Sequence, residues 1–257
     1  MEPVIQVSNL CVSYGQSEAV RNVSFSIAKG DYVGLAGPNG SGKSTLVKAL
    51  LGLAPWQKGE ILLLGEKQKK FSSWQKIGYL PQRLTNVNPL FPASVEEVVL
   101  LGLLSKKKMP KIITKSDRKK AERMLKELEI GDLKDNAFAE LSGGQQQRVV
   151  LARCLVADPE ILIFDEPSTA LDPESRDAFF AMIKKLNKEK GITIVLITHD
   201  VSHLGRFANK LMYLDKKLIY FGTFEDFCQS EKMLAYFGHH GQHMICHQHA
   251  HHREEHK

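Results

Sequence analysis

The chain has 257 residues, of which 43% are hydrophobic and 25% are charged, and its formal net charge is +6. This composition is typical of a globular protein, and the length allows one large domain or two small ones with a substantial core. No apolar run reaches the roughly 18 residues that a membrane-spanning helix needs. The N-terminal segment is acidic and lacks the apolar region of a signal peptide. We therefore expect a cytoplasmic protein, and no nucleic-acid-binding motif suggests a nucleic-acid partner.

The first predicted elements are strands. Residues 4–12 alternate loosely between polar and apolar side chains and predict an edge strand, and a second strand is expected over about 20–27. Tyr14 lies in the turn between them. An aromatic side chain there can be a simple packing contact, or it can stack on a purine ring.

The next feature is a glycine-rich loop that matches G-x-x-x-x-G-K-[ST]. It follows a predicted buried strand and precedes a predicted helix. Glycines let the backbone wrap around phosphate oxygens, and the positive end of the helix faces them. In this motif the lysine reaches the β- and γ-phosphates and the following serine can bind Mg²⁺. The loop consists of Gly37, Pro38, Asn39, Gly40, Ser41, Gly42, Lys43, Ser44 and Thr45.

Strands are predicted at 59–65 and 77–82, after which the pattern becomes helical. Helical spacing at 95–104 and 117–128, with Ser94 and Ser116 as candidate caps, predicts an inserted helical subdomain over about 84–154. The lysine-rich stretch 106–111 within it is either a solvated connection between helices or a contact with anionic lipid headgroups.

Strand and helix alternation then returns, which predicts a mostly parallel sheet covered on both faces. The expected elements are a strand at 160–165, a helix at 175–190, a strand at 192–198 and a hairpin at 210–221 with its turn at 215–216. In such sheets ligands collect at the carboxyl ends of the strands. The residues expected there are Gly37, Asp165, Glu166 and His199.

Two further motifs complete the predicted site. At the end of a strand, Asp165 can hold Mg²⁺ and Glu166 can orient and deprotonate an attacking water. Ser142, Gly143, Gly144 and Gln145 place a hydroxyl and two glycines at a helix start, which makes a second set of phosphate donors. One chain cannot easily aim both sets at one phosphate chain, whereas two copies arranged head-to-tail can.

With these motifs the sequence resembles the nucleotide-binding subunits of ABC transporters over nearly all of residues 4–225. The resemblance implies a P-loop NTPase α/β fold: a RecA-like core with an antiparallel β subdomain and an inserted helical subdomain. It assigns the Walker A loop to 37–45, the Q-loop to Gln82, the signature motif to 141–145, Walker B to 161–165 with the catalytic Glu166, the D-loop to 168–172, and the switch histidine to His199.

The resemblance also implies residue roles and partners. ATP and Mg²⁺ are the expected ligands, with Tyr14 stacking on adenine, and Ser44, Gln82 and Asp165 around Mg²⁺. Lys43, Gln82, Glu166 and His199 are the expected catalytic residues. Two copies are expected to enclose two ATP molecules and to drive separate membrane permease subunits. The chain would then be peripheral on the cytoplasmic face of the cell membrane.

The stretch 88–102 resembles ATPases of the zinc and manganese importer group. This similarity implies uptake of a divalent metal, zinc first and manganese second, with an extracytoplasmic metal-binding protein as an indirect partner. The alternatives are an iron complex or other small solute as cargo, an ABC ATPase that serves no transporter, or a metal-buffering protein.

The segment 239–257 is expected to be a disordered tail beyond an ATPase domain at 1–238. Eight of the ten histidines lie there, and imidazole and thiolate groups suit Zn²⁺. The tail is either a zinc site or only a polar end. Its candidate ligands are His239, His240, His243, Cys246, His247, His249, His251 and His252. The scattered cysteines Cys11, Cys154, Cys228 and Cys246 are expected to be reduced thiols.

Overall fold

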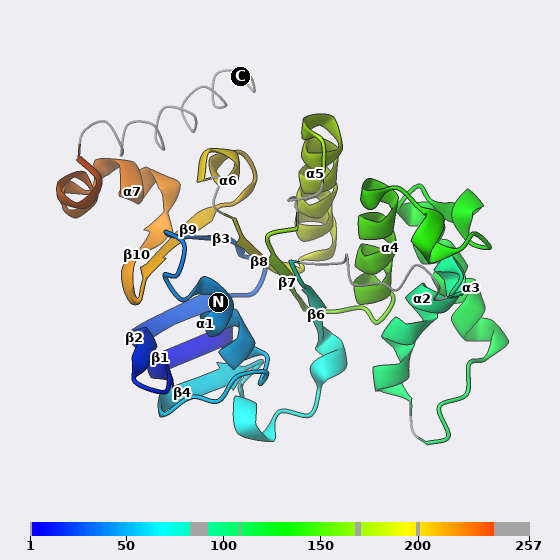
Figure 1. Ribbon diagram of the computed structural model, residues 1–257, viewed down its shortest axis with the longest axis horizontal. Helices are drawn as coiled ribbons and strands as arrows, with labels where there is room; N and C mark the ends of the chain where they lie inside the picture. The colour runs from blue at the N-terminus through cyan, green and yellow to red at the C-terminus, as the bar shows by residue number, and fades with distance from the viewer. Residues whose placement is uncertain (1, 83–91, 108, 168–170, 199–200, 239–257) are drawn as a thin grey trace. The chain divides into compact units, whose positions relative to one another are not determined.

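The computed structural model describes residues 2–238 except for 83–91, 108, 168–170 and 199–200 (Figure 1). The chain divides into two compact units. The first contains the residues up to Phe71 and those from Lys184 onward, and the second runs from Ser72 to Ile183. Among the described residues, no helix combines the length and the apolar character needed to cross a membrane.

An antiparallel sheet occupies the N-terminal part of the first unit. Its strands are β1 (Pro3–Tyr14), β2 (Ser17–Ala28), β4 (Lys58–Leu63) and β5 (Glu66–Lys67), in the order β2-β1-β4-β5. The alternation along β1 buries Val7, Leu10 and Val12. The prediction of an edge strand was wrong, because β4 pairs with the side of β1 that β2 leaves open.

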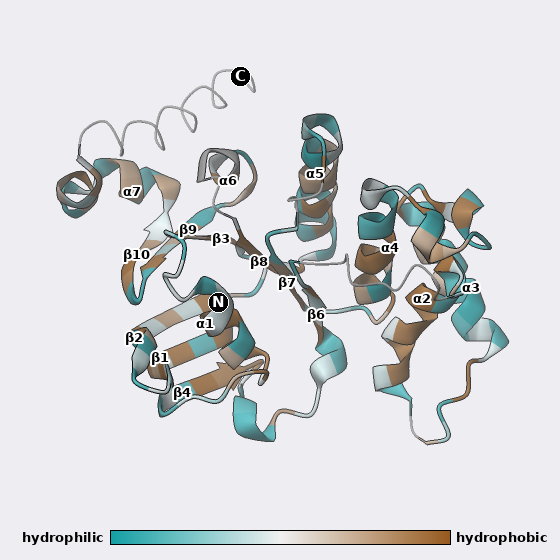
Figure 2. Ribbon diagram, viewed as in Figure 1, coloured by the Kyte–Doolittle hydropathy of each residue, from teal (hydrophilic) through white to brown (hydrophobic). Residues whose placement is uncertain are grey.

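The first unit also holds a parallel set of strands. In it, β3 (Tyr32–Ala36) pairs in parallel with β8 (Thr193–Ile197) and with β9 (Lys210–Asp215), and β10 (Lys217–Thr223) closes an antiparallel hairpin. Every residue of β3 and β8 is buried, as expected for strands covered on both faces. Figure 2 shows the hydrophobic colouring of these central strands. The helices of this unit include α1 (Lys43–Leu50), α6 (Val201–Phe207) and α7 (Phe224–Gln229), with a 3₁₀ turn at Gln68–Lys70.

The C-terminal part of the described chain packs on the hairpin through aromatic rings. Residues 231–238 are helical, and the ring of Phe237 lies 4.7 Å from that of Tyr213 and 5.6 Å from that of Phe227. Cys11 and Cys154 are free, as predicted. Cys228 is disulfide-bonded, so the prediction of a reduced thiol was wrong at this position.

The second unit combines a parallel strand pair with helices. Its strands are β6 (Ile77–Leu80) and β7 (Ile161–Asp165), and its helices include α2 (Val95–Leu100), α3 (Lys115–Glu127), α4 (Gly143–Leu155) and the start of α5 (Pro173–Lys190). Short 3₁₀ helices lie at Trp74–Lys76, Leu101–Lys106, Gly131–Leu133 and Phe138–Glu140. The rings of Phe164 and Phe179 meet edge to face at 6.1 Å, which packs α5 on β7.

The helix starts test the sequence signals for caps. Ser94 caps α2 as predicted, in a capping box with Glu97. The predicted cap Ser116 is wrong: α3 starts two residues earlier, where Thr114 accepts from the backbone of Asp117 and the Asp117 carboxylate accepts in return. The single helix predicted over 95–104 divides into α2 and a 3₁₀ continuation.

Candidate functional site

The phosphate loop leaves the buried strand β3 and enters α1. Gly37, Gly40 and Gly42 have φ values of +149°, +75° and +95°, which side-chain-bearing residues rarely adopt. The first backbone bond of α1 runs from the Leu46 N–H to the Gly42 carbonyl oxygen. The N–H groups that precede Leu46 therefore lie at the open end of the helix, where phosphate oxygens can accept from them.

Two of these glycines are also required by close backbone contacts. A Cβ on Gly37 would lie 2.0 Å from the Leu214 carbonyl oxygen, and one on Gly42 would lie 2.2 Å from the Ala19 carbonyl oxygen. Gly40, by contrast, has nothing within 4 Å of its Cβ position. The loop is therefore packed tightly at its two ends and open at its tip.

Lys43 is buried, with 6% of its surface exposed. Its ammonium group donates to the carbonyl oxygens of Gly37 and Pro38, each at 2.9 Å, and lies 3.5 Å from the hydroxyl oxygen of Ser41. These contacts hold the charge over the loop, where the motif requires it to meet the β- and γ-phosphates.

The β9–β10 turn braces the same loop, a role that the sequence patterns did not predict. The Lys216 N–H donates to the Ser41 carbonyl oxygen at 2.9 Å, and the Lys216 carbonyl oxygen accepts from the Arg21 N–H at 2.6 Å. Tyr236, from the C-terminal helical residues, donates to the Asp215 carboxylate at 3.0 Å. The sequence predicted the turn but not its hydrogen bonds, because the residues that it bonds are distant along the chain.

In the second unit, β7 delivers two acids at its carboxyl end. Asp165 is only 4% exposed, and the Tyr79 hydroxyl lies 3.5 Å from its carboxylate. Burial, together with the charge of Asp165, raises the pKa of Tyr79 to about 12, so this phenol stays protonated and can donate. Tyr79 was not predicted; the sequence placed it only on a strand.

The next residue, Glu166, has a left-handed backbone with φ of 49°. A side-chain-bearing residue pays strain energy for this conformation, and such strain is concentrated at functional sites. The Gln82 amide donates to the Glu166 carboxylate at 2.6 Å. The structure thus brings together two of the predicted catalytic residues although they are 84 positions apart in the sequence.

The signature residues form the start of α4. Ser142 accepts from the Gln145 N–H at 3.3 Å, and the Gln145 side chain accepts from the Ser142 N–H at 3.0 Å. Ser142 and Gly143 are exposed. Ser142 borders a cavity of about 290 Å³, whose wall also includes Gly144, Gln145 and Arg148. A capped helix start beside a cavity can accept an anion.

A third glutamine of the same helix fixes the strand end. Gln147 is 2% exposed and its amide donates to the Pro167 carbonyl oxygen, directly after Glu166. A buried amide needs a partner, and this bond ties α4 to the end of β7. The sequence signal that could have indicated this bond is the run of three glutamines from Gln145 to Gln147, because its third member falls on the buried side of the helix.

The remaining predicted residues fall into two groups. Tyr14 ends β1 and is 50% exposed, and Asp172 caps α5 by accepting from the Ser175 N–H at 2.9 Å. The D-loop residues 168–170, His199 and the whole tail 239–257 lie outside the described residues. Within the described part of the chain, His, Cys, Asp and Glu side chains do not gather in groups of three that could hold a metal ion.

A phosphate loop between a buried strand and a helix defines a P-loop nucleotide-binding protein, and the strand-end acids add the features of an ATPase. The sequence matches the family model for "ABC transporter" over residues 20–169, more than half of the chain. The chain belongs to the ABC transporter family and is an ATPase of that family.

Named relatives and a solved structure agree with this assignment. The zinc uptake system ATP-binding protein ZurA of Listeria monocytogenes is 41% identical over 227 residues, which cover 88% of each chain. The manganese transport system ATP-binding protein MntB of Halalkalibacterium halodurans is 35% identical over 226 residues, again 88% of each. The dimeric ATP-binding cassette MJ0796 in its post-hydrolysis state with ADP and phosphate superposes with a TM-score of 0.74 at 31% identity, covering 85% of this chain and 98% of that one.

Proposed function

We propose that this chain is the ATP-hydrolysing subunit of an importer for a divalent metal ion, zinc first and manganese second. The observation that carries the proposal is the likeness to zinc and manganese transport ATPases over 88% of the chain. The intact phosphate loop and the Gln82–Glu166 pair support an active rather than a degenerate site. The relatives supply the choice of cargo, since the cassette itself does not contact the transported ion.

In this proposal each motif residue has a defined role in binding or hydrolysing ATP. The loop N–H groups and Lys43 bind the phosphates, and Tyr14 stacks on the adenine ring. Oxygen ligands suit Mg²⁺, and Ser44, Gln82 and Asp165 offer hydroxyl, amide and carboxylate oxygens for it. Glu166 orients the attacking water, with His199 at the γ-phosphate. The Gln82–Glu166 hydrogen bond would hold the carboxylate in place, and the side-chain oxygen of Gln82 would remain available as a ligand for Mg²⁺.

We further propose that two copies associate head-to-tail around ATP. Ser142 and the N–H groups at the start of α4 would then bind the γ-phosphate of ATP held by the other copy. The dimeric state of the MJ0796 cassette supports this arrangement. Glu166→Gln should bind ATP without hydrolysing it and accumulate as a dimer in size-exclusion chromatography, and a monomer with bound ATP would argue against the arrangement.

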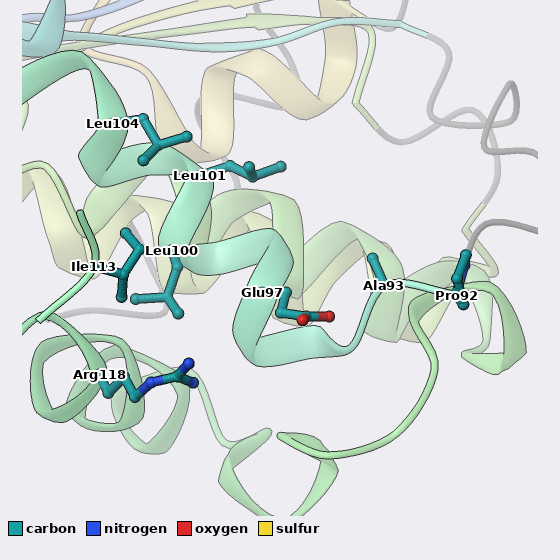
Figure 3. Close-up of a pocket in the computed structure, with 8 residues that line it drawn as sticks. All are labelled: Pro92, Ala93, Glu97, Leu100, Leu101, Leu104, Ile113 and Arg118. Carbon is teal, nitrogen blue, oxygen red and sulfur yellow. The ribbon is translucent and has the colours of Figure 1, made fainter. Parts of the chain in front are cut away.

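The membrane partners would dock on the second unit, and this places the chain on the cytoplasmic face of the cell membrane. A cavity of about 450 Å³ opens beside α2, lined mainly by apolar side chains from α2, its 3₁₀ continuation and the segment before α3 (Figure 3). Its lining residues are Pro92, Ala93, Glu97, Leu100, Leu101, Leu104, Ile113 and Arg118. A cytoplasmic helix of a permease subunit can bury an apolar side chain there. An extracytoplasmic metal-binding protein would deliver the ion to that permease.

We also propose that residues 1–238 form the ATPase domain and that the tail 239–257 binds Zn²⁺ through its histidines. The ligand types and their spacing support this, since imidazole is a preferred zinc ligand. Deletion of the tail should leave basal ATP hydrolysis unchanged and reduce the bound zinc measured by elemental analysis. An unchanged zinc content would refute a zinc site in the tail.

The cargo is tested in cells that carry the complete transporter and grow in metal-poor medium. Glu166→Gln should lower cellular zinc selectively. The control is Glu160→Gln, because Glu160 lies at the opposite end of β7 from Glu166 and pairs on the surface with Lys76 at 2.8 Å. A fall in manganese or iron alone would reassign the cargo, and unchanged metal contents would contradict metal import.

A further inference from the structure

Helix α3 presents an unusual distribution of charge. Its buried side is formed by Ala121, Met124 and Leu125. Four exposed cations follow one another at spacings of four, four and three residues, which places them on one stripe of the helix, opposite the buried side. We call this set the basic stripe; it consists of Lys115, Lys119, Arg123 and Lys126.

The basic stripe lies near acidic side chains but forms no salt bridge with them in the described part of the chain. In the described part of the chain, no carboxylate lies within ion-pairing distance of any of its four members. Glu122 on its flank attracts Lys119 and Lys126 electrostatically, but its ion pair is with Lys134 at 3.0 Å. By contrast, Lys107 just before the helix pairs with the Asp117 carboxylate at 2.7 Å. An acidic side chain of this helix therefore pairs with a cation outside the basic stripe.

Two large apolar side chains precede the stripe. Met109 is 81% exposed and Ile112 is 64% exposed, and Lys111 between them is exposed and without an ion pair in the described part of the chain. We call Met109 and Ile112 the apolar tip. Single exposed apolar residues are common, but two of them joined to a row of free cations form an amphipathic surface.

We propose that the basic stripe and the apolar tip bind the headgroup layer of an anionic membrane. The lysines and arginine would pair with lipid phosphates while Met109 and Ile112 insert between headgroups. A helix of 13 residues is about 20 Å long, which is enough to contact several lipids. The subunit would thus hold the bilayer directly, in addition to its proposed attachment to a permease.

The composition of the stripe favours lipid over a protein partner. Three of its four members are lysines, and lysine is depleted at protein interfaces whereas arginine is enriched. Lysine acts as a hydrated point charge on a flexible stem, which suits mobile headgroups. Near an anionic leaflet each basic residue strengthens binding about fivefold, so removal of three should weaken it about a hundredfold.

The test uses the full chain and co-sedimentation with vesicles of phosphatidylcholine, with or without about 30 mol% phosphatidylglycerol as the anionic lipid. We expect binding only to the anionic vesicles and release at high ionic strength. The triple variant Lys115→Gln, Lys119→Gln, Arg123→Gln should lose about two orders of magnitude in affinity. Met109→Ser with Ile112→Ser should weaken binding and leave its salt dependence unchanged.

A matched control removes the same charge from the first unit. Lys29, Lys185 and Lys217 are exposed and free of ion pairs within the described residues, so their triple change to Gln lowers the net charge equally. This control should bind anionic vesicles like the unaltered chain. Equal losses in both triple variants would refute a specific surface and indicate attraction by net charge alone.

A second measurement separates lipid from protein. In the complete transporter, the stripe variant should lower ATP hydrolysis in anionic vesicles but not in a neutral detergent without lipid. An equal loss in both would overturn the lipid proposal and assign the stripe to an acidic protein partner.

Discussion

The junction between β3 and the phosphate loop provides the sharpest steric test of the structure. In Gly37→Ala the new Cβ would lie 2.0 Å from the Leu214 carbonyl oxygen and 2.9 Å from the Ser41 hydroxyl oxygen. Ordinary van der Waals contact begins at 3.4 Å, so the backbone would have to separate by about 1.4 Å at this point. Leu214 cannot easily yield, because it is paired with Leu218 within the β9–β10 hairpin.

Two costs add in this variant. The φ of +149° is strained for alanine, which costs about 1–3 kcal/mol. Overpacking adds about 1–3 kcal/mol, for a total of about 2–6 kcal/mol out of a usual stability of about 5–15 kcal/mol. Gly40→Ala is the matched control in the same loop. Its φ of +75° also penalises alanine, but nothing lies within 4 Å of the new Cβ, so we expect about 1–2 kcal/mol.

The assay is urea unfolding of both variants without nucleotide, which measures the free energy of unfolding apart from any loss of phosphate contacts. Gly37→Ala should be less stable than Gly40→Ala and should no longer bind ATP. Equal stability of the two variants would refute the close approach of the loop to β9.

Three further changes test other parts of the structure. Thr114→Ala should cost about 1 kcal/mol of stability through loss of the α3 cap, whereas Ser116→Ala should change the stability by less than about 0.5 kcal/mol. If chemical denaturation showed the larger loss for Ser116→Ala, Ser116 would be the cap. Hydrogen bonds from the Lys107 and Thr114 side chains lower the pKa of Asp117 to about 2. The stability that this carboxylate contributes should therefore be complete above a pH of about 4 and be lost as the pH falls toward 2. Asp117→Asn should flatten that part of a plot of stability against pH. An unchanged profile would contradict the assigned bonds. Lys43→Ala should lower phosphate release by about 100-fold or more while leaving the circular dichroism spectrum intact, and near-normal hydrolysis would refute the phosphate site.

Local sequence signals predicted most of the elements because their physical causes are local. The apolar runs that became β7 and β8 are buried throughout, and Gly37 to Thr45 carries a complete motif between a strand and a helix. Ser94 likewise caps α2 as expected, and in the structure it forms a capping box with Glu97. Each of these signals lies within a few residues of the structure that it specifies.

The errors arose where the outcome depends on partners outside the segment that was read. Whether β1 is an edge strand depends on its pairing with β4, about fifty residues later, which its own alternation cannot reveal. At α3 the prediction named Ser116, whereas the cap is Thr114 with Asp117, and the salt bridge from Lys107 to Asp117 supports the earlier start.

The predictions for the functional site divide in the same way into local motifs and long-range contacts. Sequence motifs identified Gln82 and Glu166 separately, but their 2.6 Å hydrogen bond is a property of the fold. The brace from Lys216 to Ser41 and the anchoring of Pro167 by Gln147 are also long-range bonds that no motif encodes. The sequence motifs therefore indicate the groups that we propose carry the chemistry, and the structure adds what holds several of them in place.

The central claim is that ATP hydrolysis by this chain drives the uptake of a divalent metal. The most direct measurement is the accumulation of radioactive zinc by sealed vesicles that contain the complete transporter, supplied with its zinc-binding protein and with ATP on the side of this subunit. The account predicts zinc accumulation that needs ATP and that Glu166→Gln abolishes. Equal zinc accumulation with and without ATP, or in the Glu166→Gln transporter, would contradict it.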